Sequence, residues 1–174
     1  MLSETMQKAL NDQMNFEIHS GYIYAAMSAY LESIDLPGFA TWMSAQAAEE
    51  MSHAMKFYKY IHDRDGRAIF DAIPAPPSEW ASLKATFEGA LEHERIVTGK
   101  IHAIVDLAIE ERDHATQSFL KWFIDEQVEE EATATEWIKM IEMSECQPAG
   151  LMMLNREAAT RVSAVVTALA TPEE

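Results

Sequence analysis

The segment "QAAEEMSHAMKFYKYI", residues 46–61, has the composition of a helix but carries two ionisable side chains where a buried face is expected. Glu50 and His53 fall in phase with Phe39 and Phe57, at alternating steps of four and three residues. Side chains three residues apart on a helix share one face, and a carboxylate beside an imidazole is a donor set for iron, manganese or zinc. The pair alone fits either a metal site or a satisfied polar pair.

Three further apolar stripes are interrupted in the same way. Glu17 interrupts the stripe of the first helical segment and Glu94 that of the third, while Gln127 and Glu130 lie three residues apart in the fourth. At 1.5 Å per residue, Glu94 and the Gln127 to Glu130 pair both lie roughly 21 to 26 Å from the turn that joins their segments. The polar groups are therefore expected to meet inside the protein.

Four buried carboxylates need positive charge nearby, because each unpaired buried ion costs several kcal/mol. No Lys or Arg occurs in the four stripes, which leaves protons or metal. Two divalent ions would balance the four carboxylates, and the ligand types suit iron(II) or manganese, with zinc able to compete. The set predicts a metal centre in which Gln127 is either a ligand or a hydrogen-bond partner of one.

Other polar side chains near this set have more than one interpretation. Tyr24 lies seven residues after Glu17 on the same face, so it is either a hydrogen-bond or electron donor to the site or part of the core. Acidic residues flank the candidate ligands on a face that would ordinarily be solvated: Glu49, Glu126 and Glu129. The remaining histidines fall outside the stripes and are expected at the surface: His19, His62, His93, His102 and His114.

Helix-breaking residues separate the stripes and indicate an all-α fold. Breaks at 35–38, 63–79, 111–114 and 146–150 leave four helices of roughly 25 to 30 residues and a short fifth. Short connections make neighbouring helices antiparallel, and the long Pro-rich connection between the second and third is able to cross the length of a bundle. We expect a four-helix bundle in residues 1–158, followed by an extension, 159–174, without a clear structural pattern.

Composition excludes several classes of function. A formal net charge of -16 opposes binding to nucleic-acid phosphates or anionic membranes and favours cations as partners. Cys146 is the single cysteine, so an intrachain disulfide is excluded. The N-terminal residues lack a signal-peptide pattern, and no apolar run approaches ~20 residues. A cytoplasmic location is expected.

The combined motifs resemble those of the non-haem ferritins of bacteria and archaea. The resemblance covers nearly all of residues 1–158 and is carried by "LNDQMNFEIHSGYIYAAMSAYLE", "LPGFATWMSAQAAEEMSHAMKFYKYI", "PPSEWASLKATFEGALEHE" and "FLKWFIDEQVEEEA". Ferritin-like carboxylate sites take one Glu from each of two helices and Glu-x-x-His from the other two. Here the fourth helical segment departs from that pattern with Gln127 and Glu130.

The resemblance implies a ferroxidase centre. One iron would be bound by Glu17, Glu50 and His53. The second would be bound by Glu50, Glu94 and Glu130, with Glu50 bridging and Gln127 close by. A third nearby iron site would use Glu49, Glu126, Glu129 and Glu130, and Tyr24 matches a tyrosine beside the centre. The implied activity is oxidation of iron(II) by dioxygen or hydrogen peroxide, with storage of the iron(III) mineral inside a homo-oligomeric shell of 24 chains.

Three other classes of protein share features with this sequence. Met51 matches the haem-ligating methionine of bacterioferritins, but these should carry Glu-x-x-His on the fourth helix, so haem is not expected. A rubrerythrin-like peroxidase usually adds Cys-x-x-Cys pairs, which a chain with one cysteine does not have. A purely structural bundle would fill its seams with Leu, whereas the seams of this sequence carry Glu17, Glu50, Glu94 and Glu130.

Overall fold

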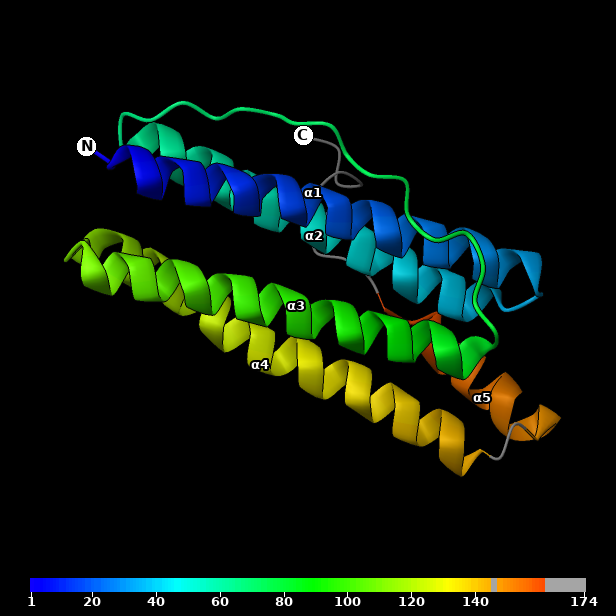
Figure 1. Cartoon of the computed structure of the whole chain (residues 1–174). Helices are drawn as coiled ribbons and strands as arrows, with labels where there is room; N and C mark the ends of the chain where they lie inside the picture. Colours follow the sequence, from blue (N-terminus) through cyan, green and yellow to red (C-terminus); the bar gives the residue numbers. More distant parts are fainter. Residues whose placement is uncertain (145–146, 162–174) are drawn as a thin grey trace, which may run out of the picture.

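The protein is a four-helix bundle with a short fifth helix, as the sequence predicts (Figure 1). The computed structural model describes residues 1–144 and 147–161. Its helices are α1 (Glu4–Ser33), α2 (Pro37–Asp63), α3 (Leu83–Glu110), α4 (His114–Met143) and α5 (Pro148–Ala158). The four long helices have 27 to 30 residues each, which confirms the predicted lengths.

Side-chain caps and turns set the helix ends close to the predicted breaks. The Ser3 hydroxyl accepts a hydrogen bond from Met6 N at 2.9 Å, and the Ser82 hydroxyl accepts one from Ala85 N at 3.1 Å. Pro37 occupies the first turn of α2, where its missing N–H leaves no gap in the helix. Left-handed backbone conformations follow the first three long helices, at Asp35, Asp65 and Arg112.

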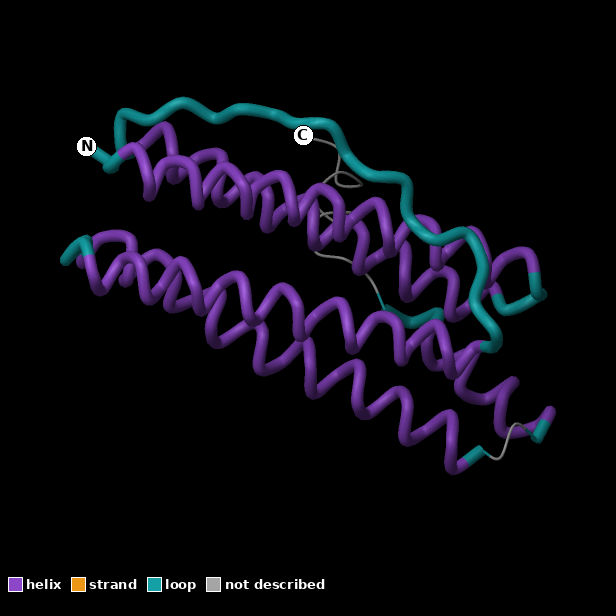
Figure 2. Tube along the Cα trace, viewed as in Figure 1, coloured by secondary structure: helices purple, strands orange, loops and turns teal. Residues whose placement is uncertain are grey.

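The helices form two antiparallel pairs joined by the long crossover (Figure 1). α1 packs on α2, α3 packs on α4, and residues 64–82 run along the length of α1 (Figure 2). Asn11 and Asn15 of α1 hold this crossover, since their amide groups donate to the backbone oxygens of Arg67 and Ile69 at 3.0 and 2.8 Å. The crossover therefore closes the bundle without regular structure of its own.

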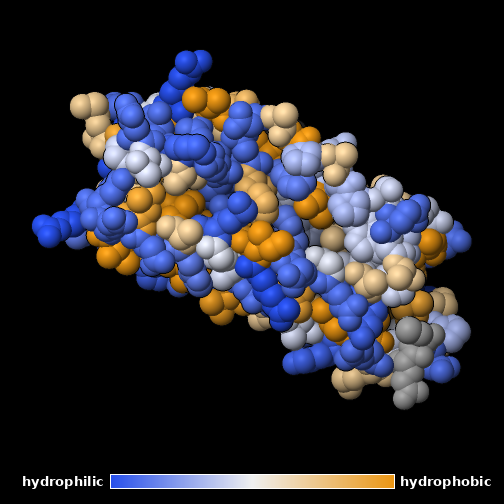
Figure 3. Space-filling model, in the orientation of Figure 1, coloured by the Kyte–Doolittle hydropathy of each residue, from blue (hydrophilic) through white to orange (hydrophobic). Residues whose placement is uncertain are grey.

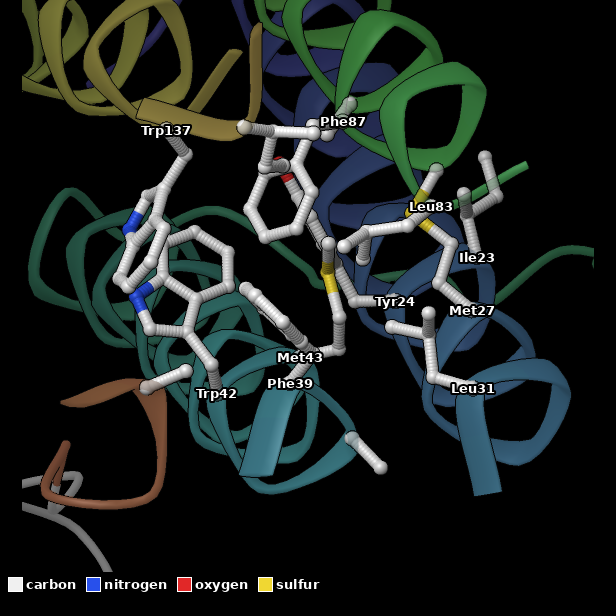
Figure 4. Packing of buried hydrophobic residues seen from close by; sticks show 14 residues of the cluster. Ile23, Tyr24, Met27, Leu31, Phe39, Trp42, Met43, Leu83, Phe87 and Trp137 are labelled. Atoms are coloured by element: carbon white, nitrogen blue, oxygen red, sulfur yellow. The ribbon is translucent and has the colours of Figure 1, made fainter. Parts of the chain in front are cut away.

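The apolar core consists of two clusters, and each of the four long helices contributes to both. One cluster lies near the start of α2 and includes Tyr24, Phe39, Trp42, Phe87 and Trp137 (Figure 4). The other fills the opposite end of the bundle and includes Leu10, Phe57, Ile101, Leu120 and Phe123. The predicted polar residues fall between the clusters along every helix, so apolar packing above and below holds them in place.

α5 docks on the beginning of α2. The side-chain oxygen of Asn155 accepts hydrogen bonds from the backbone nitrogens of Gly38 and Phe39 at 2.9 and 3.1 Å. Ala158 is fully buried in the first cluster. The predicted extension begins at 159, of which 159–161 are described and 162–174 lie outside the described residues.

Hydrophilic side chains cover most of the face seen in Figure 3, with apolar patches between them. Among the described residues, no helix is both long and apolar enough to span a bilayer.

Candidate metal centre

Three of the predicted ligands come together between α1 and α2. Glu17, Glu50 and His53 are all buried, and each offers a ligand atom within 4.8 Å of the other two. Glu50 and His53 share one face of α2, and the imidazole Nδ1 lies 3.4 Å from a Glu50 carboxylate oxygen. The structure thus brings a carboxylate from a second helix to the Glu-x-x-His pair, as expected from the interrupted stripes.

α3 and α4 add two more buried carboxylates, Glu94 and Glu130. The Tyr24 hydroxyl donates a hydrogen bond to one oxygen of Glu94. The Gln127 amide nitrogen donates to the other oxygen at 3.1 Å and also lies 3.2 Å from the Glu94 backbone oxygen. Tyr24 thus contacts the site as a hydrogen-bond donor, and the position of Gln127 favours a role as the partner that orients Glu94.

Burial and mutual repulsion disfavour the charged forms of these acids. Burial and the neighbouring Glu50 raise the pKa of Glu94 to about 8. Burial together with Glu50 and Glu94 raises the pKa of Glu130 to about 8, and burial raises that of Glu50 to about 7. The pKa of Glu17 also lies well above its usual range, because it is buried beside Glu50. Without a bound cation the cluster would therefore hold protons near neutral pH, and a cation would replace them.

The donor set fits divalent cations. Glu17 Oε2 is buried and accepts no hydrogen bond within the described part of the chain, so one carboxylate oxygen is left for a metal ion. Burial, followed by the positive charge of Lys56, lowers the pKa of His53, which keeps the imidazole neutral and able to bind a metal. Carboxylates with one imidazole suit iron(II), manganese or zinc.

Two buried glutamines that the sequence pattern did not single out support the site. The amide nitrogen of Gln13 donates to Glu17 at 2.8 Å, and that of Gln46 donates to Glu50 at 2.8 Å. Each glutamine precedes its carboxylate by four residues on the same helix, so the pair shares a face. A glutamine four residues before a buried glutamate was the signal that would have identified both.

The three flanking acids have different surroundings. Glu126 Oε1 lies 4.0 Å from Nε2 of His53. Glu49 Oε2 lies 2.5 Å from a guanidinium nitrogen of Arg161, a residue that follows α5. Glu129 is exposed on α4. Glu126 is therefore next to the cluster, Glu49 carries an ion pair that the sequence did not indicate, and Glu129 lies on the outer side of its helix.

The surface position expected for His93 is wrong. Its side chain is buried at 8% exposure, its Nε2 lies 2.7 Å from the Ser20 hydroxyl, and its ring stacks on Phe16. α3 buries a second row beside the predicted stripe, which includes Thr86 and faces α1 at His93. Burial, followed by the charge of His19, lowers the pKa of His93 to about 4, so the ring is neutral.

Met51, the residue that raised the haem alternative, lies on the outer side of the α1 and α2 pair. It is exposed and lines an apolar groove of about 490 Å³ together with Gly21, Tyr22 and Ile73. The expectation that haem is not bound stays a prediction.

Buried acids from all four helices of a bundle with one long crossover, between α2 and α3, define the ferritin-like class. The family model described as "Ferritin-like domain" matches residues 7–144. The chain belongs to this ferritin family.

Curated relatives and solved structures agree with that assignment. A bacterial non-heme ferritin of Staphylococcus saprophyticus is 47% identical over 132 residues, covering 76% of this chain and 79% of the relative. One of Staphylococcus aureus strain MRSA252 is 45% identical over 132 residues, covering 76% and 80%. The open-pore ferritin from the hyperthermophilic archaeon Archaeoglobus fulgidus is 43% identical with a TM-score of 0.92, covering 93% of this chain and all of that one. An engineered closed form of that ferritin is 44% identical with the same TM-score, covering 93% and 99%.

Proposed function

We propose that this ferritin stores iron by oxidising iron(II) at the buried cluster. Glu17, Glu50 and His53 bind one iron(II) ion, and the observation that supports this most strongly is that their ligand atoms lie within 4.8 Å of one another while fully buried. Glu94 and Glu130 bind the second ion with Glu50 as the bridge. Their raised pKa values fit this role, because carboxylates that repel one another gain most from a shared cation.

Two iron(II) ions supply the two electrons that the oxidant requires. Dioxygen takes up two electrons and two protons to give hydrogen peroxide, and hydrogen peroxide takes up two electrons and two protons to give two water molecules. Iron(II) is the substrate in both cases and leaves as iron(III). The chain contributes the ligands, excludes water with the apolar clusters on both sides, and releases carboxyl protons as the metal binds.

Further parts of the proposal extend beyond the two-ion centre. Glu49, Glu126, Glu129 and Glu130 form a third, weaker site. The iron(III) mineral is held in a shell of 24 copies of this chain, in the cytoplasm. The closeness of Glu126 to His53 supports the third site, because it places another carboxylate beside the first ion.

Aerobic loading with iron(II) tests the proposal. Purified wild-type protein should develop iron(III) absorbance and retain the iron in a fraction of several hundred kilodaltons on size exclusion. Glu94→Gln removes one carboxylate charge at nearly constant volume and should slow the oxidation by at least about tenfold, because a second ion would lose a charged ligand. Glu92→Gln, an exposed position on the same helix, is the matched control and should oxidise iron like wild type.

Two outcomes would contradict the proposal. Wild-type protein that oxidises iron no faster than buffer would exclude the ferroxidase activity. A Glu94→Gln variant as fast as the Glu92→Gln control would place the oxidation outside the buried cluster.

A further inference from the structure

A single cation from the C-terminal end of the described chain lies beside the centre. One guanidinium nitrogen of Arg161 lies 2.5 Å from Glu49 Oε2, a contact between residues 112 positions apart. The guanidinium carbon lies 4.1 Å from the centroid of the Trp42 ring, so the same group stacks on an aromatic face. Arg161 is thus held by two residues of α2, one charged and one aromatic.

The docking of α5 fixes where Arg161 can reach. Asn155 binds the backbone at the start of α2, and Ala158 is buried in the core only three residues before Arg161. The backbone nitrogen of Arg161 donates to the Ala158 oxygen at 3.3 Å, which forms a turn directly after α5. This anchoring holds the Arg161 side chain within reach of Glu49.

The positive charge of Arg161 acts on the centre as well as on Glu49. It opposes the effect of burial and lowers the pKa of both Glu50 and Glu130. The second guanidinium nitrogen, Nη1, is buried and has no hydrogen-bond partner among the described residues. The guanidinium is therefore held at this position by Glu49 and Trp42 alone among the described residues.

We propose that Arg161 is a built-in competitor for metal at the third site. Its guanidinium neutralises Glu49 while that site is empty, and a divalent ion fills the site only when the guanidinium leaves the carboxylate. The inference rests on the proposed function, because it takes Glu49 as a third-site ligand. The ion pair thereby lowers the metal affinity of the third site relative to the two inner sites, so the inner sites fill first.

Zinc titration of the full-length assembled protein tests the competition, because zinc does not change oxidation state. Arg161→Gln should retain the two tight zinc sites and tighten the next one by about tenfold, as expected when a charge-assisted contact no longer has to be broken. Arg156→Gln, an exposed arginine in the last turn of α5, is the matched control and should titrate like wild type. Adding Glu49→Gln to Arg161→Gln should abolish the gain.

Tryptophan fluorescence of the wild-type protein provides a second measurement. Zinc binding at the third site should change the emission of Trp42 in wild type, because the stacked guanidinium moves away. The Trp42 contribution is the difference between wild type and Trp42→Phe, and it should be absent from the zinc titration of Arg161→Gln.

The results distinguish this inference from the proposed function. Wild-type protein without two tight zinc sites would contradict the proposed function itself. Two tight sites together with an unchanged third site in Arg161→Gln would overturn only the competition. A gain that persists after Glu49→Gln, or a constant Trp42 emission while the third site fills, would overturn it as well.

Discussion

The Tyr24 hydroxyl on α1 donates a hydrogen bond to the Glu94 carboxylate on α3, across the buried centre and 70 residues along the chain. This bond lowers the pKa of Glu94 and so offsets part of the increase that burial and Glu50 cause. Burial raises the pKa of Tyr24 well above its usual range, so the phenol keeps its proton for donation. Tyr24 therefore helps to keep Glu94 available as a charged ligand.

Removing that donor should move zinc binding to higher pH. Tyr24→Phe leaves Glu94 with one donor fewer, so its proton is held more tightly and zinc must compete with it over a higher pH range. Zinc affinity measured between pH 6 and 8.5 checks this. Tyr30→Phe is the matched control, because its hydroxyl donates to the Trp80 backbone oxygen outside the centre. Identical pH profiles for the two variants would contradict the role given to Tyr24.

Glu130→Ala should weaken the second metal site more than the first. Glu130 is proposed to bind the second ion, while Glu17 and His53 hold the first. Binding of the first, tighter iron(II) ion should therefore survive the substitution. The fold should persist, since loss of one buried carboxyl reduces repulsion when metal is absent. Anaerobic iron(II) titration against Glu136→Ala, an exposed position on α4, measures the effect. Loss of the tighter site with the weaker one intact would reverse the assignment.

The apo protein should lose stability as pH rises, while zinc should stabilise it more. Glu50, Glu94 and Glu130 have folded pKa values of about 7, 8 and 8 against an ordinary value of 4.5. A group with a raised folded pKa contributes stability that is fully present below 4.5 and is lost as pH rises through 7 to 8. Zinc competes with those protons and binds the folded cluster, adding about 2.7 kcal/mol at a hundredfold excess over Kd.

Thermal melts of apo and zinc-loaded protein between pH 5 and 8 test this pH dependence. The increase in melting temperature caused by zinc should grow over that range in wild type and largely disappear in Glu50→Ala, Glu94→Ala. The exposed pair Glu92→Ala, Glu136→Ala controls for the loss of two charges. A zinc effect that persists in the buried double variant would mean that these acids do not form the metal site.

Gly38→Ala should displace α5. A Cβ at Gly38 would lie 1.6 Å from the Asn155 backbone oxygen, and backbone cannot yield as a side chain would. We expect a loss of about 1 to 3 kcal/mol in the free energy of unfolding. Gly99→Ala is the control, because nothing lies within 4 Å of its Cβ and a helix interior gains roughly 0.5 to 1 kcal/mol from this change. Equal unfolding midpoints in denaturant for the two variants would contradict close docking at Gly38.

Periodicity was enough to predict the four helices and the convergence of their acids. The position of Glu17 or Glu50 within an apolar stripe predicts that its side chain is buried, because the helical period fixes which face of the helix points inward. His93 was misplaced because α3 buries a wider arc than one stripe, and the width depends on the neighbouring helix. Arg161 was not foreseen because its contact with Glu49 spans 112 positions and depends on how α5 docks, which no local pattern encodes.

The crossover is held to α1 through its main chain. Asn11 and Asn15 each donate to a backbone oxygen of the crossover, and each accepts from a backbone nitrogen, at Ile69 and Asp71. None of these bonds uses a crossover side chain, so the bonds themselves do not restrict the residue type at 67, 69 and 71 as long as the backbone keeps its path. Proline is the exception at positions 67, 69 and 71, because it has no N–H to donate, and the Arg67 nitrogen donates to the side-chain oxygen of Gln7 at 3.1 Å. The hydrogen-bonding constraint on this connection therefore resides in Gln7 and the two asparagines of the helix beside it.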